Sequence, residues 1–266
     1  MNPCILTKKR KNSWTAGLCF RFCRTIFLCF VLISGLLPTG WDLTSIGTEA
    51  MGEDRHLQER EQMVRKQIRQ RGIDDEQVLK AFRKVKRHLF VPDNYQDLAY
   101  SDQPLPIGHD QTISQPYIVA LMTDALKLKE TDRVLEVGTG SGYQAAILAE
   151  ICGKVYTIEI LPELGDSARQ LLNDLGYGNV HVKIGDGYEG WAAHASYDAI
   201  IVTCSPTHVP GPLKEQLAEG GRMIIPVGKK YAQELVRLRK KEGELVEESV
   251  LPVRFVPMVD DDGKRY

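Results

Sequence analysis

The sequence is poor in cysteine and has almost no net charge, and both deficits narrow the possible functions. Of six cysteines in 266 residues, only Cys152 and Cys204 lie beyond the first fifty positions. Two cysteines make no disulfide framework, and no cysteine–histidine spacing resembles a zinc site. The formal net charge of −1 gives no overall positive field that would attract nucleic acid. We therefore expect a folded part from a reducing compartment, with no metal centre and no nucleic-acid partner.

An apolar run long enough to cross a bilayer is also missing. Residues 26–37 are apolar, but a membrane span needs roughly 20 residues. The basic residues 8–11 precede this run, as in a signal peptide, but no clear cleavage signal follows. Three interpretations of residues 1–50 stay open: a signal peptide or membrane anchor, an upstream extension with Met51 as the start of the working protein, or an ordered part of the fold. Membrane contact is expected only through this segment.

Residues 51–266 are predicted to form one domain, which begins with helices. Residues 53–71 favour a polar helix that ends at Gly72. A second helix follows Asp74 or Asp75, with apolar residues on one face. Residues 92–116 contain four prolines and are predicted to be a loop. Residues 51–115 are therefore expected to be a helical and loop region ahead of the core.

From residue 116 onward, helices and strands alternate, which predicts an α/β fold. The order favours a doubly wound, mostly parallel sheet with helices on both faces, as in Rossmann-like enzymes. We expect the core to span residues 116–228 and an antiparallel finish to occupy residues 229–266. The predicted strands are residues 133–137, 154–160, 180–184, 197–202, 222–227, 234–239 and 245–256, and the predicted helices are residues 118–128, 141–151, 162–175 and 210–217.

A glycine loop follows the first predicted core strand. Gly138, Thr139, Gly140 and Gly142 belong to a G-x-G-x-G pattern, and Glu136 stands two positions before the first glycine. Glycines allow a sharp turn and a close approach of the backbone to a ligand, although a plain strand–helix turn is the simpler interpretation of the loop alone. The spacing differs from the G-x-G-x-x-G of dinucleotide enzymes, which disfavours a dehydrogenase. In methyltransferases such a loop faces the amino-acid part of S-adenosylmethionine, and the acid helps to orient that part.

Two further acids lie near the ends of the next two predicted strands: Glu159 ends the second strand, and Asp186 follows the third. Glu159 lies where an acid can accept hydrogen bonds from both ribose hydroxyls. Asp186 is placed to accept from the exocyclic amine of adenine, and Gly187 leaves room for a close approach. Solvated strand-end carboxylates and an Asp-Gly turn are the simpler alternatives. Because open α/β sheets bind ligands at the carboxyl ends of their strands, the motifs together predict S-adenosylmethionine as the cofactor.

Residues 105–108 and 111–116, taken with the motifs above, residues 197–203 and residues 254–258, resemble the protein-L-isoaspartate O-methyltransferases. The resemblance covers roughly residues 60–259, and residues 112–116 are its most family-specific part. It implies methyl transfer from S-adenosylmethionine to the free α-carboxylate of L-isoaspartyl residues in damaged proteins, which starts their repair through a succinimide. The partners would then be isoaspartyl proteins and peptides.

The resemblance also implies the substrate side of the site. Ser114 matches the family's active-site hydroxyl, which we interpret as a hydrogen-bond donor to the substrate carboxylate. Thr112, Ile113 and the main chain around Val256 would contact the peptide. The simpler alternatives are that Ser114 caps the following helix and that Val256 lies in an ordinary edge strand. Ser114 is the one catalytic residue that we expect.

The remaining reactive side chains are interpreted as structural. Cys204 is expected to be a small packed residue, and His109 and His208 to be loop residues. Two rival functions stay open: an S-adenosylmethionine enzyme that acts on RNA or a small molecule, and a noncatalytic cofactor-binding module. We expect a monomer in the cytoplasm, where this cofactor is made, with attachment to a membrane or export as the alternative.

Overall fold

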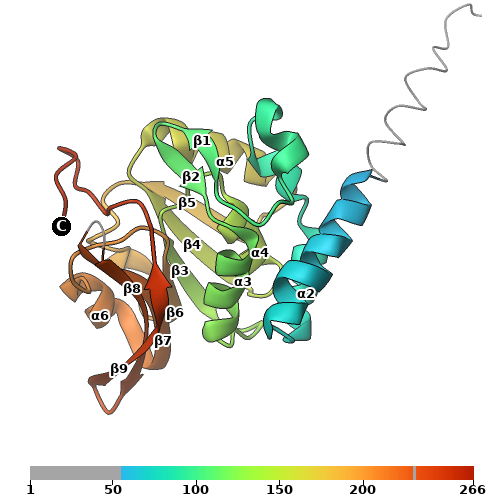
Figure 1. Cartoon of the computed structure of the whole chain (residues 1–266). Coiled ribbons are helices and arrows are strands. Elements are labelled where there is room, and N and C mark those ends of the chain that lie inside the picture. Colours follow the sequence, from blue (N-terminus) through green and yellow to red (C-terminus); the bar gives the residue numbers. More distant parts are fainter. Residues whose placement is uncertain (1–54, 230–231) are drawn as a thin grey trace, which may run out of the picture. The chain divides into compact units, whose positions relative to one another are not determined.

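The computed structural model describes residues 55–229 and 232–266, which build up a seven-stranded sheet (Figure 1). The predictions for residues 1–50 lie outside the described residues. The strand order is β5-β4-β3-β6-β7-β8-β9, with parallel pairing from β5 to β7 and antiparallel pairing from β7 to β9. This order confirms the Rossmann-like sheet and its antiparallel finish. The strands are β3 (Arg133–Val137), β4 (Lys154–Glu159), β5 (Val180–Ile184), β6 (Tyr197–Val202), β7 (Leu217–Lys229), β8 (Ala232–Lys241) and β9 (Glu244–Val253).

Both faces of the sheet are buried, because successive residues of each central strand join different apolar clusters. Val134 packs into one cluster with α4, whereas the next residue, Leu135, packs into another cluster with α6. Side chains along a strand alternate between faces, so a strand that is apolar throughout requires a cover on each side. The core helices are α3 (Pro116–Ala125), α4 (Tyr143–Ala149), α5 (Pro162–Asp174) and α6 (Gly211–Gln216).

The helices before the core confirm their predicted caps. Residues 55–63 are α-helical, and Val64–Ile68 and Arg69–Arg71 continue as one π-helical and one 3-10 turn. Gly72 ends this segment with a left-handed φ of 93°, which glycine adopts without a steric cost. Asp75 caps α2 (Glu76–Lys84) by accepting from Gln77 N at 3.0 Å. Within residues 55–229 and 232–266, no helix is long and apolar enough to span a bilayer.

The prediction of a loop over residues 92–116 was wrong in two places. Asp93–Leu98 forms a 3-10 helix, and β1 (Leu105–Gly108) pairs with β2 (Gln111–Ile113) as an antiparallel hairpin. His109 and Asp110 close the hairpin with left-handed φ values of 51° and 56°. The sheet that β1 and β2 form has only these two strands, so both are edge strands. An edge strand tolerates a proline such as Pro106. The prolines that suggested a loop are thus compatible with short edge strands.

The last predicted strand is shorter than expected. β9 ends at Val253, and Val256 lies beyond it, so the alternative that Val256 is part of an edge strand is wrong. The chain leaves the sheet and turns toward the loop after β6, where Ser205 N donates to Val256 O at 2.8 Å. Ser205 and Pro257 form a parallel bridge at the same place. This turn carries Val256 to the edge of the sheet where the cofactor motifs end.

Candidate active site

The glycine loop lies where β3 ends and α4 begins, and its glycines have left-handed φ values: 97° at Gly138, 53° at Gly140 and 86° at Gly142. A Cβ atom at Gly138 would overlap the Thr203 hydroxyl, and one at Gly142 would lie 3.2 Å from Leu172. A side chain at either position would therefore meet both backbone strain and a neighbour. The hydroxyl of Thr139 is buried against Thr157 Oγ1 at 2.7 Å. Thr139 thus contributes its backbone to the loop.

Glu159 connects the end of β4 to the glycine loop. Its carboxylate accepts from Gly140 N at 2.7 Å and from Leu161 N at 3.1 Å, and the residue is buried. These bonds hold the loop against the strand end. The carboxylate also lines a cavity, where it has further lone pairs to accept hydroxyl donors from a ligand.

Glu136 is fully buried, and neither of its carboxylate oxygens has a hydrogen-bond partner among the described residues. Burial raises the pKa of this carboxyl from 4.5 to about 8, because the charged form loses its hydration. A buried polar group without a partner is rare in folded proteins and suggests a role in binding.

Asp186 is held by two tyrosines. Its Oδ1 accepts from Tyr188 N at 2.8 Å, and its Oδ2 accepts from the Tyr266 hydroxyl. The rings of Tyr188 and Tyr266 stack at 4.1 Å. Tyr266 was not predicted as part of this site, because nothing in the sequence brings a residue from the end of the chain to the end of β5. A Cβ atom on Gly187 would overlap Val137 Cγ1, so this glycine is required by packing on β3.

A cavity of about 120 Å³ lies over these strand ends, and residues 256–259 form part of its wall. It brings together six of the predicted residues: Thr112, Gly138, Gly140, Glu159, Gly187 and Val256. Thr139, Ile113 and Ser114 line an adjoining cavity of about 50 Å³. Glu136, Gly142 and Asp186 line neither cavity. Their proposed contacts with the cofactor therefore rest on their places at the strand ends.

The cavity fits S-adenosylmethionine in the chemistry of its walls. Glu159 offers a carboxylate at one wall, and Ile160, Leu161 and Met258 offer apolar surfaces for a flat base. Gly138 and Gly140 expose backbone where side chains would obstruct a ligand. Glu159 would hold the sugar of the cofactor, the three apolar residues would hold its base, and the two glycines would hold its amino-acid part.

A larger groove of about 630 Å³ lies beside the cofactor cavity. Ser114 and Val256 both line it. Thr112 and Thr203 line this groove and both smaller cavities, so the three spaces meet at these two threonines. Thr203 had no predicted role, although it directly follows a strand at the ligand-binding edge. A group bound in the cofactor cavity can thus face a peptide in the groove.

Ser114 does not cap the helix that follows it. The N-cap of α3 is Gln115, and no side chain caps that end. The Ser114 carbonyl accepts from Arg87 Nη2 at 2.8 Å, and Arg87 is fully buried and also donates to Ala99 O at 2.7 Å. Burial lowers the pKa of the Arg87 guanidinium. This buried cation fixes the main chain of the serine, which leaves the hydroxyl available to the groove.

The remaining candidates for chemistry are structural. Burial raises the pKa of the Cys204 thiol to about 12, so it is not a thiolate at neutral pH. His109 lies exposed in the turn of the β1–β2 hairpin. His208 is exposed and bonds the Tyr188 hydroxyl at 3.2 Å.

Comparison with known proteins gives one consistent answer. Residues 58–263 match the family model of protein-L-isoaspartate(D-aspartate) O-methyltransferase. A protein-L-isoaspartate O-methyltransferase of a Picosynechococcus strain is 56% identical over 199 residues, 75% of this chain and 89% of that protein. The protein of the same name from Gloeobacter violaceus is 53% identical over 205 residues, 77% of this chain and 100% of that protein.

Solved structures agree with the sequence relatives. A protein-L-isoaspartate O-methyltransferase superposes with a TM-score of 0.71 and 32% identity, covering 77% of this chain and 67% of that chain. A Plasmodium falciparum protein described as such an enzyme superposes with a TM-score of 0.67 and 27% identity, covering 75% and 97%. That protein was crystallised in complex with S-adenosyl-L-homocysteine, the demethylated form of the cofactor.

Proposed function

Because the chain belongs to the protein-L-isoaspartate(D-aspartate) O-methyltransferase family, we propose that it methylates the free α-carboxylate of L-isoaspartyl residues in damaged proteins, with S-adenosylmethionine as the methyl donor. The observation that supports this most directly is the meeting of the cofactor cavity and the groove at Thr112 and Thr203. Ser114 lines the groove and the adjoining cavity of about 50 Å³, which share these two threonines with the cofactor cavity.

The groups at the junction act by positioning. The bound cofactor supplies an activated methyl group. The substrate carboxylate is ionised near neutral pH, so no general base is required. The Ser114 hydroxyl donates to one carboxylate oxygen, and the Val256 N–H is the second donor. Catalysis then consists of in-line alignment and exclusion of water. The methyl ester would collapse without help to a succinimide, which reopens in part to normal aspartate.

The proposal is tested with tritiated S-adenosylmethionine and matched peptides that contain aspartate or isoaspartate at one position. We expect base-labile methyl esters on the isoaspartyl peptide and little label on the matched aspartyl peptide. Equal labelling of both peptides, or acid-stable labelling of RNA, would exclude the proposed substrate. The comparisons do not favour the two rival functions, which are methylation of RNA or a small molecule and noncatalytic binding.

We further propose that residues 51–266 are the working unit, acting as a monomer in the cytoplasm. The match to the family begins at residue 58, and the cofactor is made in the cytoplasm. A chain that begins at Met51 is expected to be soluble and fully active, and light scattering is expected to give the monomer mass. An insoluble or inactive product, with the full chain active, would show that residues 1–50 are required. Cell fractionation tests the alternative of membrane attachment through residues 1–50.

A further inference from the structure

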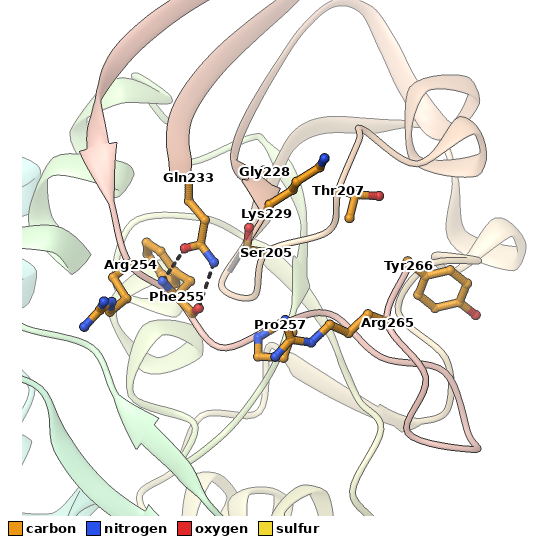
Figure 2. Close-up of a pocket in the computed structure, with 10 residues that line it drawn as sticks. All are labelled: Ser205, Thr207, Gly228, Lys229, Gln233, Arg254, Phe255, Pro257, Arg265 and Tyr266. Carbon is orange, nitrogen blue, oxygen red and sulfur yellow. Dashed lines mark hydrogen bonds between the residues drawn. The ribbon is translucent and has the colours of Figure 1, made fainter. Parts of the chain in front are cut away.

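A second large cavity, of about 530 Å³, is lined in part by Arg254, Phe255 and Pro257, the neighbours of Val256 in the chain (Figure 2). It is formed by the end of β7, the start of β8, the loop after β6, residues 254–257 and the last two residues of the chain. The proposed function assigns nothing to it. Its lining residues are Ser205, Thr207, Gly228, Lys229, Gln233, Arg254, Phe255, Pro257, Arg265 and Tyr266.

The lining of this cavity is basic, although the whole chain has a net charge of −1. Among the residues that the structure describes, it includes Lys229, Arg254 and Arg265 and no acidic side chain. The main-chain O of Tyr266, the last residue, also lies there and accepts from Thr207 N at 3.0 Å. Lys229 and Arg265 are exposed, and neither has a carboxylate partner in the part of the chain that the structure describes. The nearby Asp260 accepts from the backbone N–H groups of Asp262 and Lys264 instead. Lys229 and Arg265 outnumber the one carboxylate of this lining, that of the last residue Tyr266, so the local field is positive.

The basic cavity adjoins the substrate groove. Arg254 and Phe255 line both spaces, and the side chain of Arg254 extends away from Lys229 and Arg265 (Figure 2). Gln233 fixes this boundary, because its Nε2 donates to Phe255 O at 3.1 Å and its Oε1 accepts from Phe255 N at 2.6 Å. A peptide that crosses this boundary would pass from the groove to the cations.

We propose that this cavity is a subsite for an anionic side chain of the protein substrate, close in sequence to the isoaspartyl residue. The inference rests on the proposed function and adds a preference among its substrates. An extended peptide advances ~3.3 Å per residue, so a side chain within about three positions of the isoaspartyl residue can reach across residues 254–257. The ligand chemistry is a carboxylate or a phosphoryl group, which Lys229 and Arg265 would pair with and the hydroxyls of Ser205 and Thr207 could donate to.

The test uses isoaspartyl peptides in which one flanking position at a time carries glutamate, glutamine or phosphoserine. On one side of the isoaspartyl residue, we expect glutamate to lower KM about three- to tenfold relative to glutamine, with kcat unchanged within twofold. Phosphoserine in place of glutamate tells whether a phosphoryl group or a carboxylate is preferred. The difference between glutamate and glutamine should shrink in 0.5 M salt, because exposed charges are screened.

Variants assign the preference to the cavity. The double variant Lys229→Gln/Arg265→Gln should treat glutamate and glutamine peptides alike and keep its kcat, because both side chains are exposed and neither contacts the reacting groups. Lys241→Gln removes an exposed charge at the far end of β8 and should keep the preference. If the double variant does not fold, the single variants Lys229→Gln and Arg265→Gln are tested in its place.

Two results would overturn the subsite: equal KM values for glutamate and glutamine at every position, or a preference that survives in the double variant. If no isoaspartyl peptide is methylated at all, the proposed function fails instead. The subsite can then still be tested by binding. The affinity of a labelled glutamate peptide is measured by fluorescence anisotropy for the wild-type chain and for the double variant. Equal affinities would exclude the subsite, and weaker binding by the variant would support it.

Discussion

The cofactor side and the substrate side of the site are built in different ways. On the cofactor side, Glu136, Glu159 and Asp186 stand at or just beyond the ends of three adjacent parallel strands, and the glycine loop follows the first of them. On the substrate side, Ser114 follows an edge hairpin and Val256 follows the last strand of the sheet. The first side depends on backbone geometry repeated along one stretch of chain. The second exists only because remote segments meet, so the two sides should respond differently to mutation.

The largest effect is expected on the cofactor side, from Gly140→Val. The backbone there has a φ of 53°, and an added Cβ would lie 3.3 Å from Ile107 Cδ1, so a β-branched residue is strained and obstructs the cavity. We expect calorimetry to show at least a hundredfold loss of S-adenosylhomocysteine affinity, about 3 kcal/mol or more. Gly176→Val is the control, with a φ of 83° but open space around it, and should lose stability without losing affinity. Unchanged affinity in Gly140→Val would remove the loop from the cofactor site.

Glu136 makes the cofactor side sensitive to pH. In the unfolded chain its carboxyl ionises above pH 4.5, whereas in the folded protein it keeps its proton up to about pH 8. The folded state therefore binds more protons in this window, and the free energy of unfolding falls as pH rises from about 4.5 to about 8, by on the order of a few kcal/mol. Urea unfolding should show a flatter profile for Glu136→Gln. Glu247→Gln, an exposed control, should keep the wild-type slope, and an identical slope in both variants would contradict the assignment.

Glu159→Ala should weaken S-adenosylhomocysteine binding by roughly 1–3 kcal/mol. The change removes the proposed acceptor for the ribose hydroxyls and the bonds that hold Gly140 N and Leu161 N. Glu163→Ala, an exposed residue in the first turn of α5, is the matched control and should bind normally. A folded Glu159→Ala protein with wild-type affinity in calorimetry would refute the role.

Ser114→Ala tests the other half of the comparison. We expect about a tenfold lower methylation rate, the cost of one hydrogen bond to a charged group, with cofactor affinity within twofold of wild type. Ser167→Ala, exposed on α5, should leave both quantities unchanged. Full methylation rates at both low and saturating peptide concentrations would exclude Ser114 from the mechanism. A loss of cofactor affinity would show that Ser114 also acts on the cofactor side.

The smallest effect is expected from Tyr266→Phe, which changes a contact of Asp186 on the cofactor side. Phenylalanine keeps the stacking on Tyr188 but removes the hydroxyl that donates to Asp186 Oδ2. If Asp186 accepts the adenine amine, it loses a competing donor, and S-adenosylhomocysteine should bind two- to fivefold tighter in calorimetry. Unchanged affinity would separate Asp186 from the adenine. Weaker binding would mean that Tyr266 positions Asp186 for the cofactor.

Local rules made most of the core predictable. The strand beginning at Arg133, the Pro162 start of α5 and the Asp75 cap are each set by residues within a few positions, and all three were confirmed. The β1–β2 hairpin was missed, because four prolines usually break structure and only the pairing of two short edges makes Pro106 acceptable. The end of β9 was misplaced for a related reason. Val256 leaves the sheet to bond Ser205, a partner that no pattern in its own segment reveals.

The sequence alone determined the chemistry that repeats along one stretch of chain: the alternation of strands and helices, the glycine loop and the acids at the strand ends. Parallel strands bring their carboxyl ends to one edge, so spacing along the chain is enough to place those groups together. The tertiary structure alone decided that Thr203 borders both the cofactor cavity and the groove, that Arg87 fixes the main chain of Ser114, and that Tyr266 reaches Asp186. Those contacts join segments far apart in sequence. Packing across the whole domain selects them, and no local periodicity encodes them.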